Sequence, residues 1–326
     1  MSDNLLEIKD LSRIFDISKP WLNRLIERED RRLLRAVNDV SLNIKRGETF
    51  ALVGESGSGK STIAKMIVGL LAASSGEIRF DGVNLAEQSP TAMRNIRRRY
   101  QMIFQDPFAS LNPRWRVRDI IAEPLRKFGM GDMEGSSQKR VDELLELVGL
   151  SVKDGSKFPH EFSGGQRQRI AIARVLSSKP EFIVCDEPTS ALDVSVQAQI
   201  LNLMRDLQDD FGLTYLFISH DLSVVRHMAN RIGVLYLGRL VEVSDSKEMF
   251  RNPRHPYTQM LLEAVPDLHM TGRTRVKAAG EIPNPITPPS GCTFHPRCPL
   301  ADAHCKANIP PMVESDLGAV ACFKAT

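Results

Sequence analysis

The sequence predicts an α/β fold built on a mainly parallel sheet, and two observations support this class. Continuous apolar runs recur along the chain, and each is short enough to be one buried strand. Amphipathic helical stretches lie between these runs, which is the pattern of a parallel sheet with helices on both faces. The 326 residues are enough for one large α/β domain and a smaller appendage. The apolar runs are residues 49–53, 182–185, 213–218 and 232–237.

Two further stretches near the N-terminus alternate between apolar and polar residues. Residues 5–10 and 37–44 show the period of a half-buried strand, and residues 78–80 form a short strand before the turn Asp81-Gly82. Residues 16–36 between them look like an insertion.

Pro20 can begin a helix in this insertion, with four apolar residues on one face. That face either packs on its own domain or contacts a membrane-embedded partner. The four residues are Trp21, Leu22, Leu25 and Ile26.

The composition divides the rest of the chain into a helical region and a distinct tail. Residues 112–180 are mostly helical, with an amphipathic stripe that runs from Val141 to Val148. From about Asn252 prolines recur, and a stretch rich in Cys and His follows. We therefore expect a main domain over residues 1–251 and a C-terminal extension over residues 252–326.

Charge and hydropathy restrict the function classes. The 43 Lys and Arg nearly balance the 40 Asp and Glu, so nothing demands a nucleic-acid partner. No apolar run approaches the ~18 residues needed to span a bilayer. The start Met1-Ser2-Asp3-Asn4 lacks the features of a signal peptide. These features predict a soluble, cytosolic protein.

Residues 54–62 fit the pattern G-x-x-x-x-G-K-[ST] of a phosphate-binding P-loop. The motif lies between a predicted strand and a predicted helix, the context that it requires. Its glycines let successive N–H groups point at phosphate oxygens, and the helix N-terminus adds partial positive charge. The lysine can reach the β- and γ-phosphates and the following serine can ligate Mg²⁺. The motif consists of Gly54, Glu55, Ser56, Gly57, Ser58, Gly59, Lys60, Ser61 and Thr62.

Other polar residues stand at the ends of predicted strands. Asp186 and Glu187 end an apolar strand, where an Asp can hold the Mg²⁺ shell and a Glu can orient or deprotonate water. Gln105 follows a strand and could reach the metal and a water, and His220 could touch a γ-phosphate.

A second glycine turn leads into a helix and also suits phosphate. Two phosphate-binding turns make sense if two chains meet head to tail. This turn is Ser163, Gly164, Gly165 and Gln166.

Taken in order, these motifs resemble the nucleotide-binding subunit of an ABC transporter over roughly residues 5–250. The resemblance implies a P-loop NTPase fold with a mainly parallel core, an antiparallel N-terminal β subdomain and a helical subdomain at about residues 106–178. It implies an ATPase whose catalytic residues are Glu187, His220 and Gln105. ATP would also contact Phe15 (stacked on adenine, unless Phe15 is a core residue) and Asp193 of the D-loop. The Mg²⁺ ligands would be Ser61, Gln105 and Asp186.

A narrower resemblance is to the dipeptide/oligopeptide permease ATPases. It is carried by residues 105–114, by residues 252–258 with the Leu261-Leu262 and Ala264-Val265-Pro266 that follow, and by the terminal cysteines. Such importers use two ATPase subunits, two membrane subunits and an external solute-binding protein. The resemblance therefore implies a peripheral protein on the cytoplasmic face of a bacterial inner membrane, with a homologous ATPase as its expected partner. The cargo stays open among dipeptides, oligopeptides, nickel, glutathione, opines and oligosaccharides.

Four of the five cysteines follow residue 290, with spacing C-x5-C-x6-C-x16-C. The spacing matches neither common zinc ribbons nor the compact run of bacterial ferredoxins. Four thiolates could still hold zinc or a [4Fe–4S] cluster, and the permease resemblance favours the cluster. His295 and His304 are alternative ligands, and four unligated thiols are the remaining possibility. The four cysteines are Cys292, Cys298, Cys305 and Cys322.

Three other function classes fit less well. Translation-type ABC proteins usually carry two cassettes in one chain, and this chain has one. Repair-type proteins insert a long coiled coil, but the helical region shows no sustained heptads. A P-loop kinase would not explain residues 163–166 or His220.

Overall fold

The computed structural model describes residues 3–27, 30–130, 136–263 and 280–325. The chain folds into two compact units. One contains the described parts of residues 1–5, 44–49 and 83–219, and the other contains residues 6–43, 50–82 and 220–326. Within the described residues, no helix has the length and apolar character that crossing a membrane requires.

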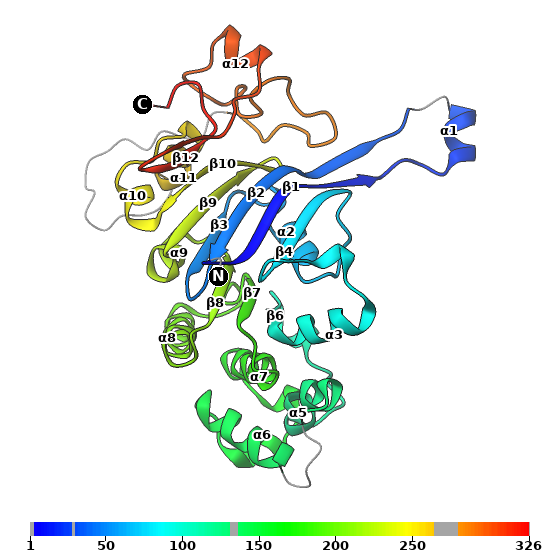
Figure 1. Cartoon of the computed structure of the whole chain (residues 1–326), viewed down its shortest axis with the longest axis vertical. Coiled ribbons are helices and arrows are strands. Elements are labelled where there is room, and N and C mark those ends of the chain that lie inside the picture. Colours follow the sequence, from blue (N-terminus) through cyan, green and yellow to red (C-terminus); the bar gives the residue numbers. More distant parts are fainter. Residues whose placement is uncertain (1–2, 28–29, 131–135, 264–279, 326) are drawn as a thin grey trace. The chain divides into compact units, whose positions relative to one another are not determined.

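The unit that carries the P-loop contains two groups of strands (Figure 1). In one group β1 (Asn4–Asp16) lies between β2 (Leu33–Lys45) and β4 (Ser75–Phe80), and β1 pairs with β4 antiparallel. This confirms the expected antiparallel N-terminal β subdomain. The second group has the order β11-β12-β10-β9-β3, in which β3 and β9 are parallel. Its strands are β3 (Thr49–Val53), β9 (Arg231–Tyr236), β10 (Arg239–Asp245), β11 (Val313–Ser315) and β12 (Gly318–Val320).

The helices of this unit include α1 (Trp21–Glu27), carried at the end of the β1–β2 arm (Figure 1). Trp21 is 67% exposed and Ile26 is 78% exposed, so these two side chains do not pack on their own domain as one alternative expected. The side chains of Leu22 and Leu25 lie outside what the structure describes. The other helices are α2 (Lys60–Ile67), α9 (Leu222–Met228), α10 (Ser246–Arg251), α11 (Pro256–Glu263) and α12 (Ala303–Ala307).

One apolar core joins the P-loop strand to the C-terminal extension. Val53 of β3 and Tyr236 of β9 belong to the same buried cluster as Tyr257 and Phe294, which both follow residue 252. A short, proline-rich tail cannot bury much apolar surface by itself, so its apolar residues pack into the core around the P-loop strand. The domain boundary at residue 252 stays a prediction.

The other unit contains a parallel group of three strands and the helices α3 to α8. Strand β7 (Phe182–Asp186) is fully buried and pairs in parallel with β6 (Tyr100–Ile103) and β8 (Thr214–Ile218). The predicted apolar runs at residues 182–185 and 213–218 thus form the buried strands β7 and β8. The helices are α3 (Pro90–Arg99), α4 (Pro107–Ser110), α5 (Val117–Phe128), α6 (Ser136–Leu147), α7 (Gly164–Ser177) and α8 (Val194–Phe211), with β5 (Val83–Asn84) and 3₁₀ turns at residues 85–87, 152–156 and 159–161.

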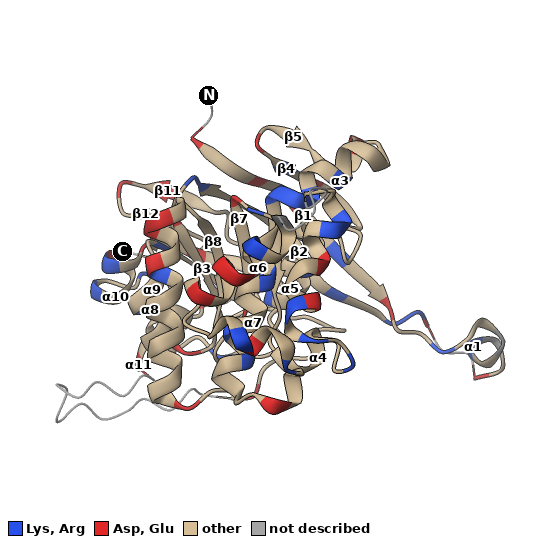
Figure 2. Ribbon diagram, turned by 90° about the horizontal axis from the view of Figure 1, so that it is seen from below, with Lys and Arg blue, Asp and Glu red and all other residues tan. Residues whose placement is uncertain are grey.

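Charges of both signs are interspersed along the ribbon (Figure 2). The basic run Arg97 to Arg99 is the last turn of α3, where cations complement the partial negative charge of the helix C-terminus. Arg99 also pairs with Glu181, with 2.6 Å between Nε and Oε1. The clustering of three arginines here is therefore explained by their place at the end of a helix.

Candidate functional site

The P-loop runs from the end of β3 into α2, as the sequence predicted. A Cβ on Gly54 would lie 2.2 Å from the Leu235 carbonyl oxygen, and one on Gly59 would lie 2.3 Å from that of Ala36. Gly59 also has a φ of 108°, which a residue with a side chain rarely adopts. Only glycine fits at these two positions, because the neighbouring backbone leaves no room.

Lys60 is the first residue of α2 and is buried with 6% of its surface exposed. Its ammonium donates hydrogen bonds to the carbonyl oxygens of Gly54 (2.8 Å) and Glu55 (3.0 Å) and to Ser58 Oγ (3.3 Å). These acceptors hold the positive charge inside the curve of the loop. The partly buried Ser61 and Thr62 follow in the first turn of the helix.

In the other unit, β7 delivers two carboxylates at its C-terminal end. Asp186 is 5% exposed, whereas Glu187 is only partly buried. Glu187 has a φ of 49°, a left-handed conformation that costs a non-glycine residue about 1–3 kcal/mol. Its N–H donates to the Ile218 carbonyl at 3.0 Å, which fixes the turn.

Gln105 follows β6 and meets Glu187. Its Nε2 donates to Glu187 Oε2 at 2.8 Å, so two residues that the sequence placed in one site do lie together. The amide oxygen of Gln105 is the atom suited to Mg²⁺, which prefers oxygen ligands.

The residues 163–166 form the start of α7. Ser163 is the N-cap and exchanges capping-box hydrogen bonds with Gln166. Gly164 and Gly165 lie in the first helical turn rather than in the turn before it, which corrects the sequence interpretation. A Cβ on Gly165 would lie 2.3 Å from Val196 Cγ1 of α8, so this glycine allows the two helices to approach closely.

The remaining predicted nucleotide contacts are placed as follows. Asp193 is the exposed N-cap residue of α8, and His220 is exposed after β8. Phe15 lies in β1, and its ring is partly buried. The Arg13 guanidinium lies 4.6 Å from the centroid of this ring. Phe15 is therefore not a fully buried core residue.

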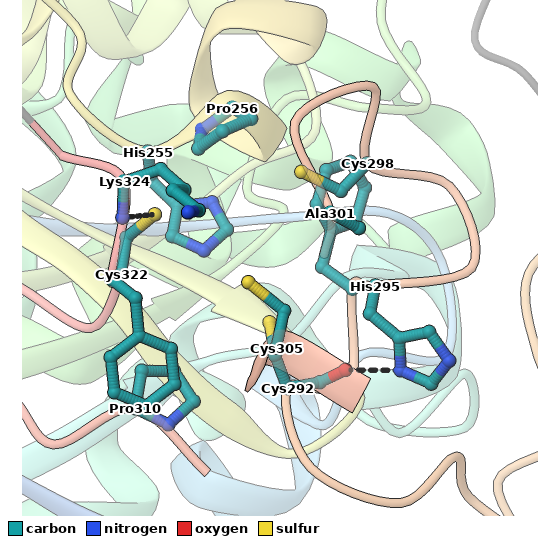
Figure 3. A pocket seen from close by; sticks show the side chains of 12 residues that line it. His255, Pro256, Cys292, His295, Cys298, Ala301, Cys305, Pro310, Cys322 and Lys324 are labelled. Carbon is teal, nitrogen blue, oxygen red and sulfur yellow. Dashed lines mark hydrogen bonds between the residues drawn. The ribbon is translucent and has the colours of Figure 1, made fainter. Parts of the chain in front are cut away.

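The four C-terminal cysteines line one small cavity of about 10 Å³ (Figure 3). His295 also lines it and bonds the Cys292 carbonyl through Nδ1 at 3.0 Å. His304 instead packs against Phe323, with 4.3 Å between ring centroids. The structure thus brings the four predicted cysteines and His295 together.

Burial raises the pKa of the Cys292, Cys298 and Cys322 thiols above their usual value. A thiol must lose its proton to bind a metal, so metal binding would have to offset the free-energy cost of deprotonating these buried thiols. Among the described residues, no three His, Cys, Asp or Glu side chains are arranged so that they could hold a metal ion.

Comparisons with known proteins agree with this geometry. Residues 37–190 match the family model "ABC transporter", and residues 241–305 match the "Oligopeptide/dipeptide transporter, C-terminal region". The chain is 48% identical over 317 residues to the oligopeptide transport ATP-binding protein AppF of Bacillus subtilis, a match that covers 96% of this chain and 94% of AppF.

Two solved structures have a similar fold. The ATP-binding cassette MJ0796, a dimer bound to ADP and Pi, is 30% identical with a TM-score of 0.64, covering 74% of this chain and 98% of that one. The cbiO1 protein of Clostridium perfringens is also 30% identical with a TM-score of 0.63, covering 77% of this chain and 92% of that one.

The fold and the matched motifs define an ATPase of the ABC class, which uses ATP with Mg²⁺. This chain belongs to the ABC transporter ATP-binding proteins, in the oligopeptide/dipeptide branch that its C-terminal region marks.

The close approach of α7 and α8 gives a first prediction. Gly165→Ala should destabilise the protein by about 1–3 kcal/mol, because the new methyl group meets the stiff Val196 side chain. Gly164→Ala is the matched control, since its Cβ would meet no atom closer than 3.4 Å. Denaturant unfolding measures both variants. The double variant Gly165→Ala/Val196→Ala should recover part of the loss, and equal stability of the two single variants would contradict the packing argument.

Proposed function

We propose that this chain is the ATP-hydrolysing subunit of an importer of dipeptides or oligopeptides. The observation that carries the proposal is the match of residues 241–305 to the oligopeptide/dipeptide transporter C-terminal region. The name of the relative AppF, an oligopeptide transport ATP-binding protein, supports the same cargo class. Nickel, glutathione, opines and oligosaccharides are the alternative cargoes.

The assembly would contain this chain, a second ABC ATPase, two membrane permease subunits and an external solute-binding protein. The chain would then be peripheral, held at the cytoplasmic face of the inner membrane by its permease partners. Co-purification from native membranes tests this arrangement by identifying the neighbouring subunits. Recovery of permease and peptide-binding subunits is the expected result, and a stable complex without membrane subunits would count against it.

In this proposal the P-loop holds the phosphates of ATP. The backbone N–H groups of residues 54–62 surround the phosphate oxygens, and Lys60 turns its ammonium from the loop carbonyls to the β- and γ-phosphates. Ser61 and Asp186 would hold Mg²⁺ with Gln105, and Phe15 would stack on the adenine.

Hydrolysis then depends on Glu187 as the base that activates water. The hydrogen bond from Gln105 supports this role because it fixes the direction of the carboxylate. His220 would contact the γ-phosphate from another strand end. The second phosphate turn, at residues 163–166, and Asp193 would face ATP bound to the partner ATPase. The dimeric structure of MJ0796, bound to ADP and Pi, supports the pairing of two such ATPase chains.

The role of Glu187 gives a prediction. Glu187→Gln should lower the turnover number of the assembled transporter about 10²- to 10⁴-fold while ATP still binds, because only the base is lost. The variant should accumulate as a closed ATP-bound dimer in size-exclusion chromatography. Near-normal turnover would remove Glu187 from this role.

Coupling to the membrane subunits is assigned to the segment after Gln105. Helix α4 is tied to α7: the Arg167 guanidinium lies 5.1 Å from the Phe108 ring centroid, and Arg174 donates to the Ser110 carbonyl at 3.1 Å. From its sequence, the segment Gln105 to Arg114 is expected to hold Phe108 and Leu111 on a surface loop. Phe108 is 50% exposed, but Leu111 is buried, so only the first part of that expectation is met. Phe108 is therefore the side chain available to a permease subunit.

Replacing Phe108 by Asp should uncouple the two activities. A charge at an apolar contact should lower peptide uptake at least ~10-fold while ATP hydrolysis stays within about twofold. Phe211→Asp is the matched control, because Phe211 ends α8 and is similarly exposed at 51%. Uptake that is unchanged by Phe108→Asp, or lowered equally by both variants, would contradict the assignment.

The cysteine cavity is proposed as a structural [4Fe–4S] site, with zinc as the alternative. The donor set fits in kind, because four thiols face one cavity, and a cluster of four irons spaces its thiolates more widely than one ion does. The side chains that would hold it are Cys292, Cys298, Cys305 and Cys322. When bound, the group would fix the short tail that lacks a core of its own.

Metal analysis of protein purified without oxygen checks this site. We expect brown protein with about four irons per chain, and one zinc per chain would support the alternative. Replacement of Cys298 by Ser should release the metal. If neither metal is present and all four thiols are labelled in the folded protein, both proposals fail.

A further inference from the structure

The C-terminal extension contacts the P-loop through the side chain of Glu55. Arg297 donates two hydrogen bonds to the Glu55 carboxylate, at 2.7 and 3.0 Å. The Arg297 side chain is only 3% exposed and that of Glu55 is 25% exposed. This ion pair is bidentate and its arginine is buried, so it differs from an ordinary surface salt bridge.

The backbone of Glu55 is held as well. Its N–H donates to the Tyr257 hydroxyl oxygen at 2.9 Å, and its carbonyl accepts from the Lys60 ammonium at 3.0 Å. Within the P-loop, the Ser58 N–H also donates to the Glu55 carbonyl at 3.2 Å. Glu55 is therefore held from two sides, by Tyr257 and Arg297 of the C-terminal extension and by Lys60 and Ser58 of the P-loop itself.

Tyr257 and Arg297 are themselves fixed by an aromatic cluster. The Tyr257 ring is fully buried, and its centroid lies 4.6 Å from that of Tyr236 and 5.4 Å from that of Phe294. The Arg297 guanidinium lies within 6 Å of the Tyr236 and Phe294 ring centroids. The hydrogen bonds to Glu55 raise the pKa of Arg297, so this cation stays charged at every pH of interest. Both residues thus reach the loop from a rigid support.

We propose that Tyr257 and Arg297 are positioning residues that hold the P-loop in the conformation that binds ATP. The P-loop can use Lys60 either on the Glu55 carbonyl or on a phosphate. When Lys60 turns to a phosphate, Tyr257 and Arg297 keep Glu55 and its neighbouring N–H groups in place. A loop ordered in advance loses less entropy on binding, which increases affinity.

The inference rests on the proposed role of the P-loop in ATP binding and predicts a specific pattern of kinetic effects. Losing a positioning contact should weaken ATP binding and raise KM, whereas kcat should change little because the base and the water are untouched.

The sharpest variant is Tyr257→Phe, which removes one oxygen and keeps the ring. We expect the Kd for MgATP of the full chain to rise about three- to tenfold, the range for one buried hydrogen bond, with kcat of the assembled transporter within about twofold. Tyr215→Phe is the matched control, because the Tyr215 hydroxyl is also buried but bonds the Met204 carbonyl of α8. It should leave the Kd unchanged even if it lowers Tm equally.

A second set of variants tests the ion pair. Arg297→Lys keeps the charge but loses the bidentate contact, so it should also raise the Kd for MgATP. The double variant Glu55→Gln/Arg297→Gln should cost no more than the worse single variant, because the pair acts as a unit. An unchanged Kd in both Tyr257→Phe and Arg297→Lys, or a Kd that simply follows Tm across all variants, overturns the inference.

Lys60→Ala distinguishes a failure of the P-loop's role in ATP binding from a failure of the positioning role. This variant should lose most of its affinity for MgATP. If it binds MgATP as tightly as the natural chain, the role of the P-loop itself is wrong. If it loses affinity while Tyr257→Phe and Arg297→Lys do not, only the positioning role fails.

Discussion

The close packing of the P-loop against the backbone of two neighbouring strands is the constraint on which the site depends. The carbonyl oxygens of Leu235 on β9 and Ala36 on β2 occupy the space that side chains at Gly54 and Gly59 would need. The Ser58 carbonyl also accepts a hydrogen bond from Gly238 at 2.9 Å. The loop is therefore held by rigid strands, and its N–H groups have a fixed direction before any phosphate arrives.

In the other unit, buried strands likewise fix the positions of the candidate catalytic residues. A fully buried parallel strand carries Asp186 and Glu187 to its C-terminal end, and Gln105 reaches them from the end of the neighbouring strand β6. Arg167 and Arg174 of α7 contact Phe108 and Ser110 of α4, the helix that follows Gln105 in the chain. These contacts hold α4, and with it the half-exposed Phe108, against α7.

Much of this could be predicted from the sequence, because the main signals are local. The apolar strands and the P-loop are encoded in short stretches, and the structure confirms them. The contact of Arg297 with Glu55 spans 242 residues of sequence, and no local pattern predicts it. The exposure of Trp21 and the burial of Leu111 depend on tertiary packing that periodicity alone does not determine. The close approach of Val196 to Gly165 could have been suspected only from the absence of a side chain there.

ATP-driven uptake of a labelled oligopeptide in liposomes tests the central claim most directly. The liposomes would contain this chain with its co-purified membrane subunits, with ATP on the side of the ATPase and the solute-binding protein on the other side. The account predicts peptide accumulation that requires hydrolysable ATP and is lost when Lys60 is replaced by Ala. Steady ATP hydrolysis without peptide accumulation, in liposomes that accumulate nickel or another solute instead, would contradict it.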